Sequence, residues 1–359
     1  MRRAFAQLEA GAGGLVSVDP LLDRAWEDLV ERAPGGSIFH HPAWLRLIHD
    51  HYGFPVSAWC LADANGRVVG GIPVTLLNSR LTGARLIAMP FSDACPPLLD
   101  PSAGVELSAL AAGVAQARRD LGLALEVRGA LPGSPEGDVI ERYVQHQLPL
   151  QPDVDEVVRG FTKSHVLRGI AKARREGVTI ERRTDREGLA RFYRLHTQTR
   201  RRQGIPTQSR RFILGFSTLF DAGLGFVMLA RHQGRDIAAA VFFNAANTLT
   251  YKFGASDRRF LSLRPNNLLF MEAIEWGCQN EQRILDFGRT DHANNGLRDF
   301  KKTWGAQESP LDFTYFGEYD ATIGRGRARR AMSTMITHAP PSFSRLVGET
   351  LYRLNWPER

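Results

Sequence analysis

Lysine is scarce in this chain, because only five of its 46 basic residues are lysines and the other 41 are arginines. Cysteine is scarce too, and the three cysteines, Cys60, Cys95 and Cys278, lie far apart. An odd number of widely spaced cysteines indicates buried free thiols in a reducing compartment, not a disulfide framework. Since no Cys or His cluster has the spacing of metal ligands, we expect a cytoplasmic protein without a bound metal.

Long apolar runs are missing as well. No stretch of about 18 consecutive apolar residues occurs, so the sequence predicts no transmembrane helix. The opening residues, MRRAFAQLEAGAGG, are basic but lack the apolar stretch of a secretory signal, and we expect no such leader. What the chain does have is size. Its 359 residues, 43% of them hydrophobic, are enough for about two domains with cores of ordinary size.

The charge balance is positive, with a formal net charge of +8. A positive balance favours anionic partners such as phosphates, nucleic acid or an acidic membrane face. Composition by itself does not distinguish these three partners.

The two halves of the sequence resemble each other. Residues 61–74, LADANGRVVGGIPV, align without gaps with residues 229–242, LARHQGRDIAAAVF, and each block is followed by a strand, a Ser-Asp pair, a proline and a helix. The alternative is a chance match between two hairpins with a glycine turn. Strands interleaved with helices, twice, predict two α/β units. We expect an N-terminal subdomain over 1–151, a second over 152–320 and a basic helical tail over 321–359.

Five segments, in order, resemble the FemAB family of peptidyl and aminoacyl transferases within the GNAT acyltransferase superfamily. The similar region spans roughly residues 37–318. The segments are SIFHHPAWLRLI (37–48), KSHVLRGIAKARREGVTIE (163–181), RFYRLHTQTRRRQGIP (191–206), TYKFGASD (250–257) and LDFGRTDHANNGLRDFKKTWGA (285–306).

The resemblance implies a fold and a reaction. The fold is α/β (α+β), with two tandem GNAT-like subdomains, each a mixed, mainly antiparallel sheet flanked by helices. The reaction is transfer of an aminoacyl or acyl group to an amine of a cell-envelope precursor similar to peptidoglycan. A neutral amine attacks an activated ester, so catalysis needs donors for the oxyanion and correct orientation of the amine. No serine or cysteine nucleophile is required, and no hydrolase-type elbow motif occurs.

The late F-K pair gives the first candidate residues. Phe300 and Lys301 align with that pair, and the resemblance implies that Lys301 stabilises negative charge on the substrate or the transition state. Lysine suits this role as a compact point charge. The alternative is a solvated basic turn whose aromatics enter the core. Asp291 is expected to orient the amine or accept a proton through water, with helix capping as the alternative. Lys302 has no counterpart in the family pattern.

Four more residues are predicted to bind substrate. Arg168 aligns with a family arginine that contacts substrate phosphate, and a solvent-facing basic helix is the alternative. Tyr251 lies beside Gly254 on the strand where GNAT folds splay apart, and it could equally be a core aromatic. Arg289 and Arg298 are predicted anion contacts of low specificity.

The acyl donor is left open between aminoacyl-tRNA and acyl-CoA. Acetyl-CoA enzymes of the GNAT type carry a glycine-rich pyrophosphate loop after the splayed strand, whereas residues 256–267, SDRRFLSLRPNN, contain no glycine. This absence argues against CoA. Two alternatives remain, a CoA-dependent acyltransferase of exopolysaccharide synthesis and a non-catalytic GNAT-like binding module.

The expected partners are aminoacyl-tRNA and an anionic envelope precursor, which could be lipid-linked. In the tail, basic residues alternate with apolar ones, which is typical of helices that bind a membrane surface. A peripheral site at the inner membrane would fit a lipid-linked acceptor, and a helix packed back on the domain is the alternative.

Overall fold

The computed structural model describes residues 14–79, 83–162, 165–318, 327–338, 347–348 and 352. The chain folds into two compact units that are interleaved along the sequence. Among the described residues, the first unit comprises 14–144 and 310–318, and the second comprises 145–309, 327–338, 347–348 and 352. Strands β7 (Gly137–Pro149) and β13 (Gln307–Phe316) contribute residues to both units. The division of the chain into three contiguous segments, 1–151, 152–320 and 321–359, stays a prediction.

The first unit has the strand order β1-β2-β3-β4-β6-β13, and β5 pairs with β3. Among the pairs with a defined register, only β4 and β6 are parallel. Its elements are β1 (Leu15–Val18), α2 (Arg24–Arg32), α3 (Pro42–Tyr52), β2 (Val56–Ala62), β3 (Val68–Ser79), β4 (Gly83–Ala88), β5 (Leu98–Leu99), the 3-10 turn η1 (Pro101–Ala103), α4 (Leu107–Leu121) and β6 (Leu125–Val127).

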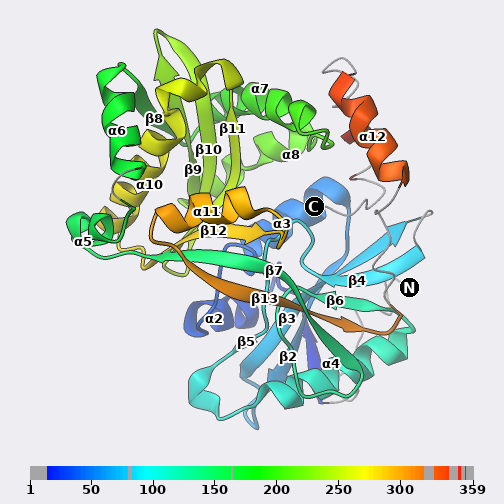
Figure 1. The fold of residues 1–359 in the computed structure, drawn as a ribbon. Helices are drawn as coiled ribbons and strands as arrows, with labels where there is room; N and C mark the ends of the chain where they lie inside the picture. Colours follow the sequence, from blue (N-terminus) through cyan, green and yellow to red (C-terminus); the bar gives the residue numbers. More distant parts are fainter. Residues whose placement is uncertain are drawn as a thin grey trace. The chain divides into compact units, whose positions relative to one another are not determined.

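Alternating side chains of this sheet enter two cores. Trp59 of β2 joins the core under α4, which includes Leu110 and Val114. The next residue along, Cys60, joins the core under α2, where Trp26 is fully buried. A strand repeats every two residues, so neighbouring side chains face opposite helices. Figure 1 shows α2 and α4 beside this sheet.

The second unit repeats the plan with the order β8-β9-β10-β11-β12-β7. Strands β8 to β11 are antiparallel, and β11 pairs in parallel with β12. Its elements are α5 (Val154–Arg159), α6 (Val166–Arg175), β8 (Thr179–Arg183), α7 (Arg186–Arg202), α8 (Arg210–Gly215), α9 (Ser217–Asp221), β9 (Gly225–His232), β10 (Arg235–Ala245), β11 (Thr248–Ser256), η2 (Arg258–Leu263), α10 (Pro265–Gln279), β12 (Ile284–Thr290), α11 (Asn295–Thr303) and α12 (Arg327–His338).

Helices cover both faces of the second sheet (Figure 1). On one face Phe226 and Phe242 pack with Phe270 of α10 in a core that also receives α5 and α6. On the other, Phe243 meets Phe216 and Phe220 of the α8–α9 segment. Both units are therefore mixed, mainly antiparallel sheets flanked by helices, which confirms the predicted fold class. The matched segments 61–74 and 229–242 are the β2–β3 and β9–β10 hairpins.

The three cysteines are free and buried, as the sequence predicted. Burial raises the pKa of each thiol, so all three stay protonated at neutral pH. Within the described ranges, no helix combines the length and apolar character needed to cross a bilayer.

Only part of the predicted tail lies within the described residues. There, α12 packs against the end of α7, where a side chain on Gly204 would collide with Ser333. Tyr352 is buried, and its hydroxyl donates to the carbonyl of Pro206 at 3.1 Å. These contacts fit the packed-back alternative for the tail, while contact with a membrane surface stays a prediction.

Candidate active site in the second unit

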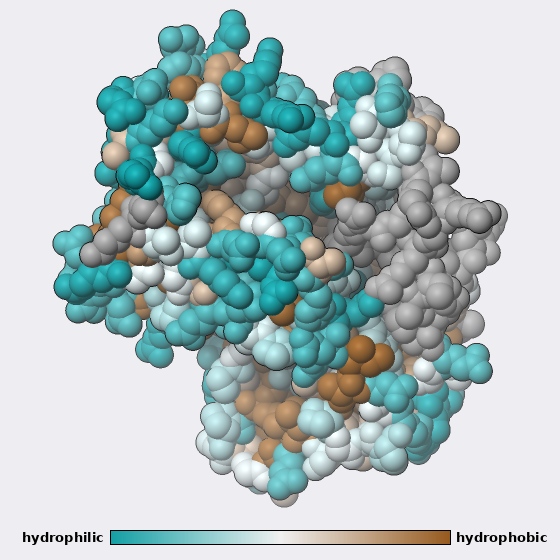
Figure 2. Space-filling view, in the orientation of Figure 1, coloured by the Kyte–Doolittle hydropathy of each residue, from teal (hydrophilic) through white to brown (hydrophobic). Residues whose placement is uncertain are grey.

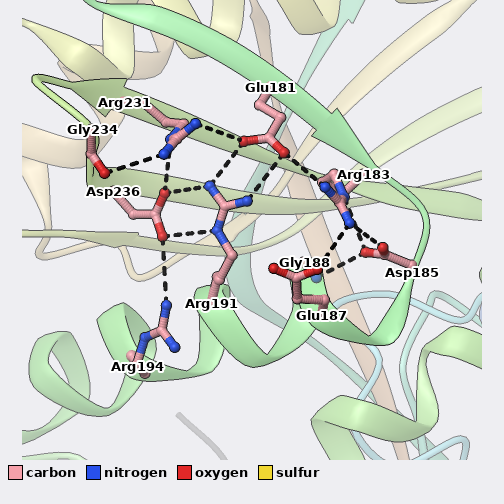
Figure 3. Close-up of polar contacts among 10 residues, drawn as sticks. All are labelled: Glu181, Arg183, Asp185, Glu187, Gly188, Arg191, Arg194, Arg231, Gly234 and Asp236. Carbon is pink, nitrogen blue, oxygen red and sulfur yellow. Dashed lines mark hydrogen bonds and ion pairs between the residues drawn. The ribbon is translucent and has the colours of Figure 1, made fainter.

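An ion-pair network fixes α7 on the sheet of the second unit. Arg191 of α7 bonds both Glu181 of β8, at 2.9 Å and 3.1 Å, and Asp236 of β10, at 2.6 Å and 3.0 Å. Arg231 of β9 bridges the same two carboxylates at 3.5 Å, and Arg194 adds an ion pair with Asp236, as Figure 3 shows. Because α7 is held at several points, the side chains of its later turns have defined positions over β10 and β11.

Strands β11 and β12 pair over a short distance and then separate. Their parallel register runs from Thr248 opposite Ile284 to Thr250 opposite Asp286. β11 continues to Ser256 and β12 to Thr290, and no register joins these continuations. The backbone edge of β11 beyond Thr250 is therefore not paired with β12. Such an opening exposes N–H groups that a substrate carbonyl can accept from.

A bulge at Lys252 sets which face each aromatic of β11 occupies. Tyr251 lies opposite Phe242 and Phe253 lies opposite Val241, so Lys252 is the extra residue. As a result Tyr251 contacts Phe270 of α10 with ring centroids 4.9 Å apart. Phe253 lies on the α7 side instead. The regular alternation of a strand would place both rings on the same face.

Gly254 gives Tyr251 its room. A Cβ at Gly254 would collide with the Tyr251 hydroxyl, so the ring lies along the strand over the glycine. Burial raises the pKa of Tyr251 to about 12, which keeps the phenol protonated as a hydrogen-bond donor. The two predicted roles of Tyr251 are thus compatible, because its ring is in the core while its neutral hydroxyl lies at the strand.

Lys301 is buried on α11, with 2% of its surface exposed. Its ammonium group donates to the carbonyl of Gly288 at 2.8 Å, to the hydroxyl of Thr290 at 2.7 Å and to the carbonyl of Arg289 at 3.3 Å. All three partners belong to the end of β12, past its pairing with β11. The solvated-turn alternative is therefore wrong for Lys301, because the charge is held inside the unit.

Glu308 of β13 forms ion pairs with other cations of this region. Arg298 bonds it bidentately, at 2.8 Å for both contacts, and Lys302 lies 3.1 Å away. His146 Nε2 lies 3.0 Å from the same carboxylate. Hydrogen bonds from Arg298 lower the pKa of Glu308 to about 2. The pKa of His146 is lowered by burial and by the Lys301 charge. Glu308 is anionic at neutral pH, and it balances the positive charge near Lys301.

The other predicted residues lie around this centre in different ways. Phe300 is half-buried against Phe270, with centroids 5.9 Å apart, and joins the same core as Tyr251. Asp291 is exposed, and its carboxylate accepts from the backbone N–H of Ala293 at 3.0 Å. This geometry is that of a turn residue ahead of α11. Arg168 is exposed on α6.

These positions leave the functional assignments open. The β12–α11 segment brings Arg289, Arg298, Phe300 and Lys301 close together, whereas Arg168 lies on a separate helix. The roles of all seven predicted residues stay predictions.

A short 3-10 helix takes the place of a glycine loop after β11. Asp257 caps η2 by accepting from the N–H of Arg259 at 3.0 Å. Within the turn, the N–H of Phe260 donates to the backbone carbonyl of Asp257, and the N–H of Arg264 donates to the backbone carbonyl of Leu261. These N–H groups are used internally and do not form a concave anion nest.

Sequence reasoning missed two residues beside β11 and one on β13. His196 and Arg200 lie one turn apart on α7 and both contact Phe253, with the His196 ring 5.3 Å and the Arg200 guanidinium carbon 5.8 Å from its centroid. Glu308 was missed as well. The i, i+4 spacing of His196 and Arg200 is visible in the sequence, but the face that it meets depends on the bulge in β11.

Residues 161–302 match the family described as "Acetyltransferase (GNAT) domain". The matched segment covers 142 of the 359 residues. It contains the diverging strands β11 and β12 and ends next to Lys301. The match confirms the predicted enzyme class, an acyltransferase. No curated protein matches the sequence.

Solved structures show the same architecture over most of the chain. FemX has a TM-score of 0.60 at 16% identity, covering 84% of this chain and 97% of FemX. L-PGS from Bacillus licheniformis has a TM-score of 0.56 at 12% identity, with 90% and 99% covered. A tandem GNAT protein of the clavulanic acid biosynthesis pathway has 0.51 at 15% identity, with 85% and 100% covered. These similarities confirm the FemAB-like, tandem GNAT fold.

Proposed function

We propose that this protein is an N-acyltransferase that transfers an aminoacyl group to an amine of an anionic cell-envelope precursor. The observation that carries the proposal is a buried ammonium group, Lys301, fixed at the end of β12 where that strand has left β11. The second unit therefore combines an unpaired strand edge with a positive charge beside it. Acyl transfer requires both features, because the attacked carbonyl oxygen becomes negative.

The chemistry needs no covalent enzyme intermediate. A neutral substrate amine attacks the ester carbonyl, and the C–N bond forms as the carbonyl electrons move to oxygen. The oxyanion accepts from backbone N–H groups of β11 and from the protonated hydroxyl of Tyr251, and the charge of Lys301 stabilises it. The tetrahedral species then collapses, the C–O bond breaks, and the alcohol leaves with a proton that originated on the amine.

Lys301 can supply this charge without leaving its position. Two of its contacts are short, at 2.7 Å and 2.8 Å, and the third, to the Arg289 carbonyl, is 3.3 Å long. The weakest contact is the one that an oxyanion would replace most readily. Phe300 precedes it on α11 and packs into the core, so the helix that carries the lysine has little freedom to move.

The proposed donor is an aminoacyl-tRNA ester and not acyl-CoA. The turn η2, with its N–H groups bonded internally, supports this choice because it provides no nest for a pyrophosphate. Positive charge on the chain fits both an RNA donor and an anionic acceptor. Arg168 and Arg289 are the proposed phosphate contacts.

Substitution of Lys301 tests the function. Purified protein is supplied with a mixture of radiolabelled aminoacyl-tRNAs and amine-bearing, nucleotide-linked peptidoglycan precursors, and transfer of label to the precursor is measured. Lys301→Met should lower the transfer rate by about 100-fold or more, the scale expected for loss of an oxyanion-stabilising group. Lys302→Ala is the matched control, and it should keep the rate within about twofold because exposed ion pairs contribute little.

Two results would contradict the proposal. One is wild-type transfer by a Lys301→Met protein whose circular dichroism spectrum is unchanged. The other is strong stabilisation of the wild-type protein by coenzyme A, because a ligand at 100 times its dissociation constant raises the unfolding free energy by about 2.7 kcal/mol.

A further inference from the structure

Arg200 is a half-buried cation without an anionic partner among the described residues. Its Nε is buried and makes no hydrogen bond. No carboxylate of the described residues lies within ion-pair distance of its guanidinium, in contrast to Arg191 on the same helix, which bonds two. Desolvating a charge without compensation is costly, so such an arginine indicates an anion that is absent from the protein itself.

The guanidinium is also fixed in place. Its carbon lies 5.8 Å from the centroid of Phe253, and the ammonium group of Lys252 lies 5.2 Å from the same ring. A stacked guanidinium loses less side-chain entropy when it binds, because its plane is already oriented. Phe253 therefore holds the Arg200 guanidinium in a fixed orientation beside the part of β11 that does not pair with β12.

The neighbouring histidine adds no charge. His196 is buried, its Nε2 bonds the side-chain oxygen of Gln208 at 2.8 Å, and its Nδ1 has no partner. Burial, and secondarily the charge of Arg200, lowers the pKa of His196 to about 3, so the ring is neutral. The site thus contains a cation and an unused hydrogen-bond acceptor on one face of α7.

The site is accessible from one side. Arg200 is only partly buried, and Figure 2 shows the surface of the second unit hollowed between α7 and α11. The negative group of a substrate can therefore reach the guanidinium without opening the core.

We propose that Arg200 binds a carboxylate of the acceptor substrate, close to the amine that is acylated. The inference rests on the proposed function for the amine, and it narrows the acceptor to molecules with an amino-acid-type group. A carboxylate is proposed over a phosphate because the two coplanar oxygens of a carboxylate match the planar edge of a single guanidinium group. The guanidinium donates two parallel N–H hydrogen bonds to the oxygens of a planar carboxylate.

The test compares two ligands that differ only in the carboxylate. L-Lysine and 1,5-diaminopentane are titrated into the full-length protein at constant ionic strength, and the unfolding midpoint and the heat of binding are recorded. Lysine should bind and raise the midpoint, and diaminopentane should bind at least about tenfold more weakly, as expected for loss of a charge-assisted hydrogen bond. Because no turnover is needed, this result is independent of the transfer assay.

Variants of the arginine separate a binding role from a structural one. Arg200→Gln should weaken lysine binding about tenfold or more, and Arg200→Lys should restore it only in part, since it keeps the charge and loses the fork. Without ligand, neither variant should lower the unfolding midpoint, because a cation without an anionic partner contributes little stability. Arg210→Gln, at an exposed arginine on α8, is the control and should bind lysine as the wild type does.

Three outcomes would overturn the proposal. They are equal affinity of the wild-type protein for both ligands, unchanged lysine affinity in Arg200→Gln, and no binding of lysine at about 50 mM, well above the concentrations used for specific sites. Inorganic phosphate displacing lysine at a lower concentration than acetate does would refute the carboxylate assignment. A large fall in the unfolding midpoint of Arg200→Gln without ligand would assign Arg200 a structural role instead.

Discussion

The two units use the same strand order but end their parallel strand pairs differently. In the first unit, the segment after β4 is hydrogen-bonded to the end of β6. The Arg128 guanidinium donates to the carbonyl of Ser92 at 2.6 Å, and the backbone N–H of Cys95 donates to the carbonyl of Arg128 at 2.7 Å. Gly129 packs directly against Pro96. In the second unit, the end of β12 is held by Lys301, and the edge of β11 beyond Thr250 is not paired with β12.

The positive charges at the two openings also have different contacts. The positive charge at the first opening, Arg128, is paired with the carboxylate of Glu126 at 3.0 Å. The charge at the second opening, Lys301, bonds two backbone carbonyls and a hydroxyl at the end of β12. The family match also covers only 161–302. A duplicated scaffold can keep one copy for packing and one for catalysis.

The largest expected difference between the units comes from two glycines. Gly129→Ala would place a Cβ 2.4 Å from the Cα of Pro96, so backbone must move, and we expect a loss of about 3 kcal/mol of unfolding free energy. Gly254→Ala meets the Tyr251 side chain instead, which can rotate. It should cost about 1 kcal/mol and lower the transfer rate more than Gly129→Ala does.

Urea unfolding and the transfer assay measure both effects. Gly296→Ala is the neutral control, because an added Cβ there meets nothing within 4 Å. Equal losses of stability for Gly129→Ala and Gly254→Ala would show that the two openings are equally rigid.

A smaller difference is expected in acid. Burial lowers the pKa of His40 in the first unit to about 4 and that of His196 in the second to about 3. The unfolded chain binds these protons first, so stability falls as pH drops below about 6.5, by up to about 1.4 kcal/mol per pH unit for each histidine. Below about pH 4 the loss continues only for His196.

Hydrogen exchange of each unit between pH 7 and 4 measures this dependence. His40→Asn should flatten the pH dependence of the first unit alone, and His196→Gln that of the second. Glu308 in the second unit and Asp100 in the first, each with its pKa lowered to about 2, add a further loss below about pH 4 in both units. A second unit that loses as much stability between pH 6.5 and 4 in His196→Gln as in the wild type would contradict this assignment.

The smallest expected effect is at Lys302. Its contact with Glu308 is half-exposed, and Glu308 keeps Arg298 as a bidentate partner. Lys302→Ala should therefore change the unfolding free energy by about 0.5 kcal/mol or less, whereas Lys301→Met should cost about 1–3 kcal/mol because carbonyls at the end of β12 lose a buried donor. Chemical denaturation of the Lys301→Met and Lys302→Ala proteins measures this difference. Equal losses of unfolding free energy would show that the burial of Lys301 does not make it more important for stability than Lys302.

Local patterns predicted much of the architecture. The match between 61–74 and 229–242 identified two equivalent hairpins, because a tight glycine turn and alternating apolar residues are short-range features. Pro42 and Pro265 begin helices α3 and α10, a position that suits proline because its missing N–H would have no partner there. The F-K motif marked Phe300 and Lys301 as candidate site residues, whereas the helix that carries them, α11, was not predicted.

The sequence by itself determined the fold class and the repeated order of strands and helices, because these follow from patterns within a few residues. Only the tertiary structure decided that Lys301 is buried while Lys302 faces Glu308, and that Tyr251 and Phe253 face opposite sides of the sheet. For the two aromatic residues the reason is that a single inserted residue, Lys252, reverses which face of the sheet the following side chains occupy. Long-range packing also brings His196 and Arg200 of α7 against Phe253 of that strand, and no local sequence pattern encodes this contact.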